Sequence, residues 1–327
     1  PTVVAAADSG RVYAFSPELD EYRDHDDDPA TFAPLCVGTG ADGAPVAWLP
    51  PPVIGQLDAD DAGLEIVLAA PHGIYAFRRD GTPVAPPSAP GVSVGLLAAH
   101  ENVTLPPVLV PAGADESPDA PQLVCAATVA ADVDGAPTWL RFFGPDGAEA
   151  RDPVRLSGVA SAAPVRAGRL LFVPIVTPAG DAALQAVSWP GSGPPTVAWS
   201  VDLDLMAPLR PVTVTPTAVL ATDAEGRGQT VHLDAAGPRV GPLWSGDVAA
   251  ASTIGVGGGV LGAGGLGRLG ETGVWQTGWP RVPRPEATSG GAEPLALGDP
   301  DDPTGFLFAT ADGRLFLAAA DGMVVDG

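Results

Sequence analysis

The sequence contains no lysine. All 16 basic residues are arginine, against 39 acidic residues, which leaves a formal net charge of −23. Such an excess of negative charge repels phosphate backbones and anionic lipid surfaces. The composition therefore predicts that the protein binds no nucleic acid and does not insert into membranes.

Long apolar runs and cysteines are also scarce. No run reaches the 18 residues or so that a membrane-spanning helix needs. The chain starts at Pro1 without a Met or a signal peptide, so we expect a processed or trimmed product. Cys36 and Cys125 are the two cysteines. Cys125 lies in an apolar run typical of a buried strand, and a Cys36–Cys125 disulfide is an open alternative.

Catalytic signatures are missing as well. The sequence has no GxSxG, HExxH or CxxC motif and no P-loop. Its glycine-rich stretch, 255–265, is not followed by a helical pattern, as a dinucleotide-binding loop would be. The sequence thus predicts no catalytic and no organic-cofactor residue.

A recurring phrase is present instead: an apolar run, a turn with Gly, then a second run with aromatic residues. It is clearest at 2–15, 65–77 and 305–317. Counting looser copies, the second runs centre near residues 13, 75, 140, 186, 231, 268 and 315, a step of about 50 residues. That length suits four short strands and their turns, the size of one propeller blade.

The repeats predict one all-β domain, a β-propeller with seven four-stranded blades, with six or eight as alternatives. The predicted blade boundaries are approximately 1–50, 51–104, 105–157, 158–205, 206–247, 248–284 and 285–327. Residue 1 falls where a second strand should begin, so blade one lacks its innermost strand. Upstream sequence in a longer parent chain, or the last segment 323–325, would supply it.

Four tryptophans keep the same phase as the repeats. Each follows a hairpin and precedes the next Pro- or Val-rich run. We interpret them as outer-strand side chains wedged between neighbouring sheets, where a large ring fills the gap. They are Trp48, Trp199, Trp244 and Trp279.

Acidic residues gather in the loop after the innermost strand of three blades. Carboxylates on alternate residues can surround a hard cation with oxygen atoms, and such a set suits calcium better than zinc. The sequence predicts structural Ca²⁺ sites there. The candidate ligands are Asp58, Asp60, Asp61 and Glu65 in blade two, Asp115 and Asp119 in blade three, and Asp299, Asp301 and Asp302 in blade seven.

At the blade-two residues the chain resembles the FG-GAP/VCBS repeats of integrin-like propellers, whose typical phrase is GDLDGDGxxEIVV followed by DGxxYAF. Residues 55–67 and 72–77 carry the likeness. Gln56 stands where that family usually has its first Asp, and the loop is one residue longer. The resemblance implies a calcium-binding repeat protein of the cell surface.

These features predict a non-enzymatic propeller, secreted or on the cell surface, either extracellular or periplasmic. It would bind a protein or glycan, or form a structural unit of a larger surface assembly. The alternative is a propeller enzyme, such as a lyase, a glycosidase or a quinone-dependent dehydrogenase, with its active site at the channel mouth. A third possibility is an ordered piece of a longer multidomain protein.

Overall fold

The computed structural model describes residues 3–7, 9–15, 34–40, 42–58, 63–84, 95–100, 102–115, 117, 120–130, 135–190, 193–215, 217–245, 253–254, 259–262, 265–268, 295–299, 302–309, 315–319 and 324–326. Within these ranges every regular element is a β-strand. No described segment is therefore a helix that could cross a membrane. The chain divides into two compact units, Pro1–Leu156 with Ser188–Thr196 and Ser157–Val187 with Val197–Gly327.

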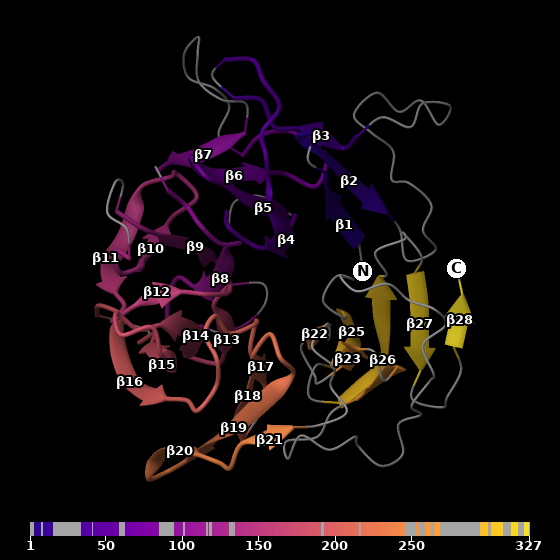
Figure 1. Cartoon of the computed structure of the whole chain (residues 1–327). Coiled ribbons are helices and arrows are strands. Elements are labelled where there is room, and N and C mark those ends of the chain that lie inside the picture. The colour runs from indigo at the N-terminus through magenta and orange to yellow at the C-terminus, as the bar shows by residue number, and fades with distance from the viewer. Residues whose placement is uncertain are drawn as a thin grey trace. The chain divides into compact units, whose positions relative to one another are not determined.

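The first unit holds three antiparallel sheets, each with its strands in chain order (Figure 1). The first sheet contains β1 (Val3–Ala6), β2 (Arg11–Phe15) and β3 (Cys36–Val37). The second contains β4 (Leu49–Gly55), β5 (Glu65–Ala70), β6 (Gly73–Phe77) and β7 (Leu96–Ala99). The third contains β8 (Val108–Pro111), β9 (Gln122–Thr128), β10 (Trp139–Phe143) and β11 (Glu149–Arg155).

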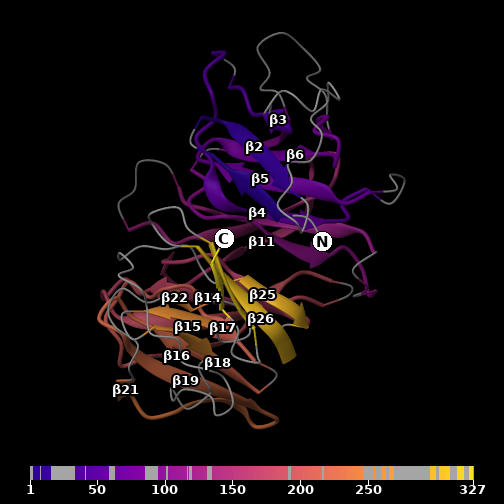
Figure 2. The same ribbon diagram turned by 90° about the vertical axis from the view of Figure 1, so that its right-hand side faces the viewer.

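The strands from β12 onward form four further sheets (Figure 2). The fourth sheet contains β12 (Val159–Ala160), β13 (Val165–Ala167), β14 (Leu170–Val176), β15 (Ala182–Ser188) and β16 (Thr196–Asp202). The fifth contains β17 (Thr213–Val214), β18 (Ala218–Thr222), β19 (Arg227–Asp234), β20 (Gly237–Val240) and β21 (Trp244–Ser245). The sixth contains β22 (Thr253–Ile254), β23 (Gly259–Gly262) and β24 (Gly265–Arg268), and the seventh contains β25 (Leu295–Asp299), β26 (Asp302–Ala309), β27 (Leu315–Ala319) and β28 (Val324–Asp326).

The predicted hairpins coincide with these strands. Each of the seven predicted second strands lies in a strand of the structure, namely β2, β6, β10, β15, β19, β24 and β27. In the first sheet β1 pairs with β2, as β5 pairs with β6 in the second sheet. The described part of the first sheet contains no strand that corresponds to β4, the innermost strand of the second sheet. The last segment pairs with β27 as the fourth strand of its own sheet. The blade boundaries and the number of blades in a closed ring stay predictions.

The β5–β6 hairpin is buried on both faces, because successive side chains of a strand point to opposite sides. One set of its side chains packs with the first sheet, in a cluster that includes Val12, Ala14, Ile66, Leu68 and Tyr75. The alternate set packs with the third sheet, in a cluster that includes Val67, Ala69, Ile74, Val124 and Ala126. The core of this unit is thus a series of apolar layers between neighbouring sheets.

Trp48 fills the layer between the first and second sheets. Its ring meets Tyr75 edge-on, with the centroids 5.0 Å apart, and is buried to 6% exposure. Gly38 lies directly under the ring, and a Cβ there would come within 2.2 Å of two ring carbons. Trp48 precedes β4, so it fills an inter-sheet gap as predicted but from the approach to an innermost strand instead of from an outer one.

Two of the other three tryptophans that keep the phase of the repeats lie within the described residues, and both pack against neighbouring groups. Trp199 lies on the outer strand β16 and packs on Phe172, with the centroids 5.8 Å apart. Trp244 covers Gly228, where a Cβ would meet its ring at 2.3 Å. Trp279 lies outside the described residues.

The two cysteines are buried and free. Cys125 lies within β9 and Cys36 begins β3, so the structure does not form the disulfide that the sequence left open. Burial disfavours the charged thiolate and raises the pKa of Cys36 to about 12, and it raises the pKa of Cys125 as well.

Candidate functional site

The acidic loop of the second sheet is held by its own side chains. Glu65, the first residue of β5, is 1% exposed, and its Oε2 accepts a hydrogen bond from the Leu57 backbone N–H at 2.7 Å. The side-chain amide of Gln56 donates to the backbone carbonyl of Asp58. Asp60 and Asp61 lie outside the described residues. One predicted calcium ligand, Glu65, thus already fixes the two ends of the loop.

A calcium ion takes six to eight oxygen atoms. Of the four predicted ligands in this loop, the structure describes the side chains of Asp58 and Glu65 alone. Across all described residues, no three or more His, Cys, Asp or Glu side chains come together in a way that could hold a metal ion. Calcium binding by this loop stays a prediction that depends on Asp60 and Asp61.

The other two acidic loops are described only in part. Asp115 is exposed, and its Oδ1 accepts the Ser117 backbone N–H at 2.9 Å, which is an ordinary turn contact. Asp119 and Asp301 lie outside the described residues. Asp299 and Asp302 are opposite each other where β25 and β26 meet. Their side chains are not described, so these two calcium sites also stay predictions.

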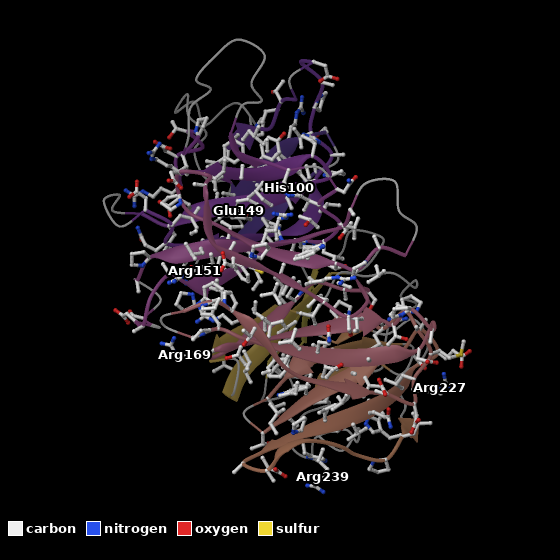
Figure 3. All side chains as sticks on the ribbon, turned by 90° about the vertical axis from the view of Figure 1, so that its left-hand side faces the viewer. His100, Glu149, Arg151, Arg169, Arg227 and Arg239 are labelled. Atoms are coloured by element: carbon white, nitrogen blue, oxygen red, sulfur yellow. The ribbon has the colours of Figure 1, made fainter. Side chains whose placement is uncertain are left out.

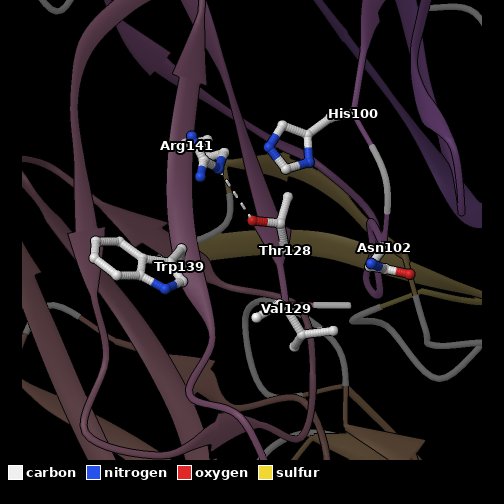
Figure 4. Close-up of a pocket in the computed structure, with 7 residues that line it drawn as sticks. His100, Asn102, Thr128, Val129, Trp139 and Arg141 are labelled. Atoms are coloured by element: carbon white, nitrogen blue, oxygen red, sulfur yellow. Dashed lines mark hydrogen bonds between the residues drawn. The ribbon is translucent and has the colours of Figure 1, made fainter. Parts of the chain in front are cut away.

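A pocket of about 220 Å³ lies at the other end of the second and third sheets (Figure 4). Strands alternate in direction, so the β7–β8 connection and the β9–β10 turn share one end of these sheets, while the acidic loop after β4 is at the opposite end. The pocket is lined by His100, Asn102, Thr128, Val129, Ala130, Trp139 and Arg141.

The wall formed by residue 100 and residues 102–104 is fixed from two sides. The backbone N–H groups of His100 and Val103 donate to His72 and Pro71, in the β5–β6 turn, at 3.2 and 3.1 Å. Toward the third sheet, Thr104 donates to Ala127 at 3.0 Å, and the Asn102 carbonyl accepts from Val129 at 3.1 Å. These four backbone hydrogen bonds hold the pocket in shape before any ligand arrives.

Asn102 has a backbone φ of 60°, a left-handed conformation that only glycine adopts freely. Among residues with side chains, Asn tolerates this conformation best. The Asn102 side chain places an amide group in the pocket wall, and a glycine at this position would place no polar group there. Such a conformation persists where the surrounding structure fixes it, and here the Asn102 carbonyl is fixed by the hydrogen bond from Val129.

Arg141 of β10 reaches diagonally across the β9–β10 pair to Thr128, whose direct cross-strand partner is Trp139. The Nε of Arg141 donates to Thr128 Oγ1 at 3.3 Å, the dashed line in Figure 4. The Nη1 group pairs with the carboxylate of Glu149 at the start of β11, and Figure 3 labels Glu149 together with His100. The His100 ring is held by an edge contact with Phe143, with the centroids 6.4 Å apart. The guanidinium is therefore held in position and its charge is compensated.

Sequence reasoning did not find this pocket. Its residues come from three segments, and none of these segments carries a recognisable spacing; they are His100 and Asn102, then Thr128, Val129 and Ala130, then Trp139 and Arg141. The signal that the sequence did offer was weak: Asn102 lies in a connection between two apolar strands. A pocket of this kind becomes visible only when the pairing of strands brings the segments together.

The comparisons with known proteins concern the fold. No protein-family model and no curated protein match the chain. Among solved structures, a crystal structure of BBS1N in complex with ARL6DN, soaked with lead, aligns with a TM-score of 0.57 and 13% identity over 98% of this chain and 88% of that chain. The same complex soaked with mercury aligns with a TM-score of 0.58 and 12% identity. BamB from Moraxella catarrhalis aligns with a TM-score of 0.48 and 15% identity, over 98% and 80% of the two chains.

BBS1N is a β-propeller, and its likeness to this chain extends over almost the whole length. Together with the successive antiparallel sheets, it shows that the chain has the propeller fold that the repeats predicted. At this level of identity the likeness shows the fold alone. Membership of the FG-GAP/VCBS family stays a prediction.

Proposed function

We propose that this β-propeller is a non-enzymatic binding module that holds a protein partner outside the cell or at the cell surface. The observation that carries the proposal is the pre-formed pocket between the second and third sheets, whose wall is fixed by backbone hydrogen bonds on two sides. The neighbour BBS1N was crystallised in complex with ARL6DN. It supports the proposal by showing that a propeller of this kind can serve as a binding surface.

The charge of the chain indicates what kind of partner it holds. A net charge of −23 creates a field that attracts basic surfaces and repels acidic ones over about 8–10 Å at physiological salt. Complementary charge mainly accelerates encounter and selects among partners. We therefore expect a partner with a basic face.

The location outside the cell is part of the proposal and has its support in the resemblance to FG-GAP/VCBS repeats at residues 55–67 and 72–77. The calcium sites are supported by the spacing of the carboxylates and by the same resemblance. Where Ca²⁺ binds in blade two, Asp58, Asp60, Asp61 and Glu65 would hold it, and its role would be to neutralise clustered carboxylates and order a turn.

The experiment uses the purified chain as bait for surface and secreted proteins of its source, followed by calorimetry with each captured protein after purification. A basic partner that binds with an affinity that falls as salt rises supports the proposal. Arg239→Ala, an exposed outer-strand change, serves as the control. Turnover of a small molecule, or the absence of any partner that binds in purified form, would overturn it.

A further inference from the structure

The pocket beside Asn102 presents donor groups that the protein itself does not use. Within the described part of the chain, neither the side-chain amide of Asn102, nor the indole N–H of Trp139, nor the Nη2 group of Arg141 has a hydrogen-bond partner. Donors that stay unpaired in a half-buried wall favour a ligand that carries acceptor oxygens.

The charge around the pocket argues against an anionic ligand. Arg141 is already paired with Glu149, so an incoming carboxylate would compete with that partner and gain no new charge pair. The whole chain carries −23, which repels an anionic ligand in general. A ligand with neutral oxygens meets none of this repulsion.

The size of the pocket limits what enters it. At about 220 Å³ it is smaller than the roughly 300–1,000 Å³ of pockets that enclose a drug-sized ligand. It therefore accepts one end group of a larger molecule. Trp139 supplies an apolar ring next to the polar groups of the pocket. A ligand that suits this combination has a C–H face to pack on the ring and several hydroxyl oxygens to accept from the planar donors.

We propose that this pocket binds a neutral sugar residue at the end of a glycan, with Asn102 and Arg141 donating to its hydroxyl oxygens and Trp139 packing beside its ring. The same pocket supports the proposed function, so this inference rests on it: the sugar would be the end residue of a glycan that the protein partner carries. A protein partner that binds equally well after removal of its glycans would overturn the sugar site and leave the proposed function standing. The four backbone hydrogen bonds of residue 100 and residues 102–104 mean that binding requires little ordering of the protein, which favours affinity for a small group.

The test is binding of the purified full chain to immobilised glycans that end in neutral hexoses or N-acetylhexosamines, beside sialylated and sulfated glycans and acidic peptides. Asn102→Gly is the sharpest variant, because glycine adopts a φ of 60° without strain and only the amide is lost. We expect it to weaken binding about three- to tenfold, the effect of one uncharged hydrogen bond. Trp139→Ala should weaken binding further.

Arg239→Ala is the matched control, since Arg239 is an exposed arginine on β20, and it should bind as the unmodified chain does. Thermal unfolding of each variant separates a lost contact from a lost fold, and Asn102→Gly should unfold at the same temperature as the unmodified chain. Absence of binding to every neutral glycan overturns the sugar site. So does binding that is unchanged in Asn102→Gly and Trp139→Ala, or binding confined to acidic peptides or anionic glycans.

Discussion

The Nε of Arg227 donates to Oδ2 of Asp223 at 2.8 Å, and its Nη2 lies 2.8 Å from the same oxygen. The Asp223 side chain is fully buried at the turn between β18 and β19, and Arg227, labelled in Figure 3, is the first residue of β19. The backbone N–H groups of Met206, Glu225 and Arg227 also donate to this carboxylate. One buried carboxylate thus ties together the turn and the loop after β16.

Loss of this carboxylate should destabilise the fold. We expect Asp223→Ala to lower the free energy of unfolding by about 3 kcal/mol, because it leaves Arg227 and three backbone donors without their acceptor. Urea unfolding measures the change. The matched control is Glu225→Ala, an exposed partner 3.6 Å from the same Arg227, which should cost about 0.5 kcal/mol or less. Equal effects of the two variants would contradict the role given to Asp223.

The same carboxylate predicts a loss of stability in acid. Burial alone would raise the pKa of Asp223, but the N–H groups of Met206 and Arg227 and the guanidinium of Arg227 outweigh it and hold the pKa below its ordinary value. The stability that it contributes is therefore complete above the unfolded pKa of about 3.9 and is lost as the pH falls through the lower folded pKa.

Urea unfolding of the unmodified chain and of Asp223→Asn at about pH 7, pH 5 and pH 3 checks this sign. The two free energies should differ by the same amount at the two higher pH values and approach each other at the lowest. A difference that widens in acid would show that the folded pKa is raised instead.

Gly38 should not accept a side chain. A methyl group there would come within 2.2 Å of the Trp48 ring, which is itself confined between two sheets. We expect Gly38→Ala to cost about 1–3 kcal/mol of unfolding free energy, as overpacking usually does. Gly113→Ala, where a Cβ would meet nothing within 4 Å, should change stability by less than about 0.5 kcal/mol. A neutral Gly38→Ala would mean that Trp48 moves easily.

Calcium should stabilise the chain if the acidic loops bind it. At roughly a hundredfold excess over the dissociation constant a bound ion adds about 2.7 kcal/mol, so we expect the unfolding temperature to rise by about 5 °C and to return with a chelator. Asp58→Asn should reduce the shift, and Asp234→Asn, an exposed acid on β19, should not. Identical unfolding temperatures in calcium and in chelator would dismiss the calcium prediction.

The two thiols should be inert in the folded protein. Cys36 and Cys125 are buried and their pKa values are raised, so little thiolate is present at neutral pH. A chromogenic disulfide reagent should react slowly with the folded chain and rapidly with two thiols after denaturation without reductant. Detection of no thiol in the denatured chain would instead show a disulfide.

The fold was largely predictable from the sequence because each hairpin is a local pattern. Residues 65–77 read as two apolar runs around a turn, and they form β5 and β6 with every side chain of the two strands buried. The position of Trp48 was predicted less well. Its phase in the repeat shows that it belongs between sheets, but the strand from which it reaches that place depends on long-range packing.

The candidate site could not be predicted in the same way. Glu65 was read as a calcium ligand because of its spacing from Asp58, yet the structure also gives it a backbone partner, the Leu57 N–H. The pocket depends on Asn102, Thr128 and Arg141, which strand pairing alone brings together. Asn, Thr and Arg are common residue types in loops and strands, so only the spatial arrangement of these three residues identifies them as part of a pocket.

The alternate burial of the β5–β6 hairpin has a consequence for how the chain could be shortened. Because one face of the hairpin packs on the first sheet and the other on the third, deleting that repeat would expose apolar side chains of both sheets. Among the described residues, the apolar surfaces of the first and third sheets each pack against the hairpin, and they do not pack against each other. A propeller of this sequence is therefore harder to trim by one unit than its modular appearance suggests.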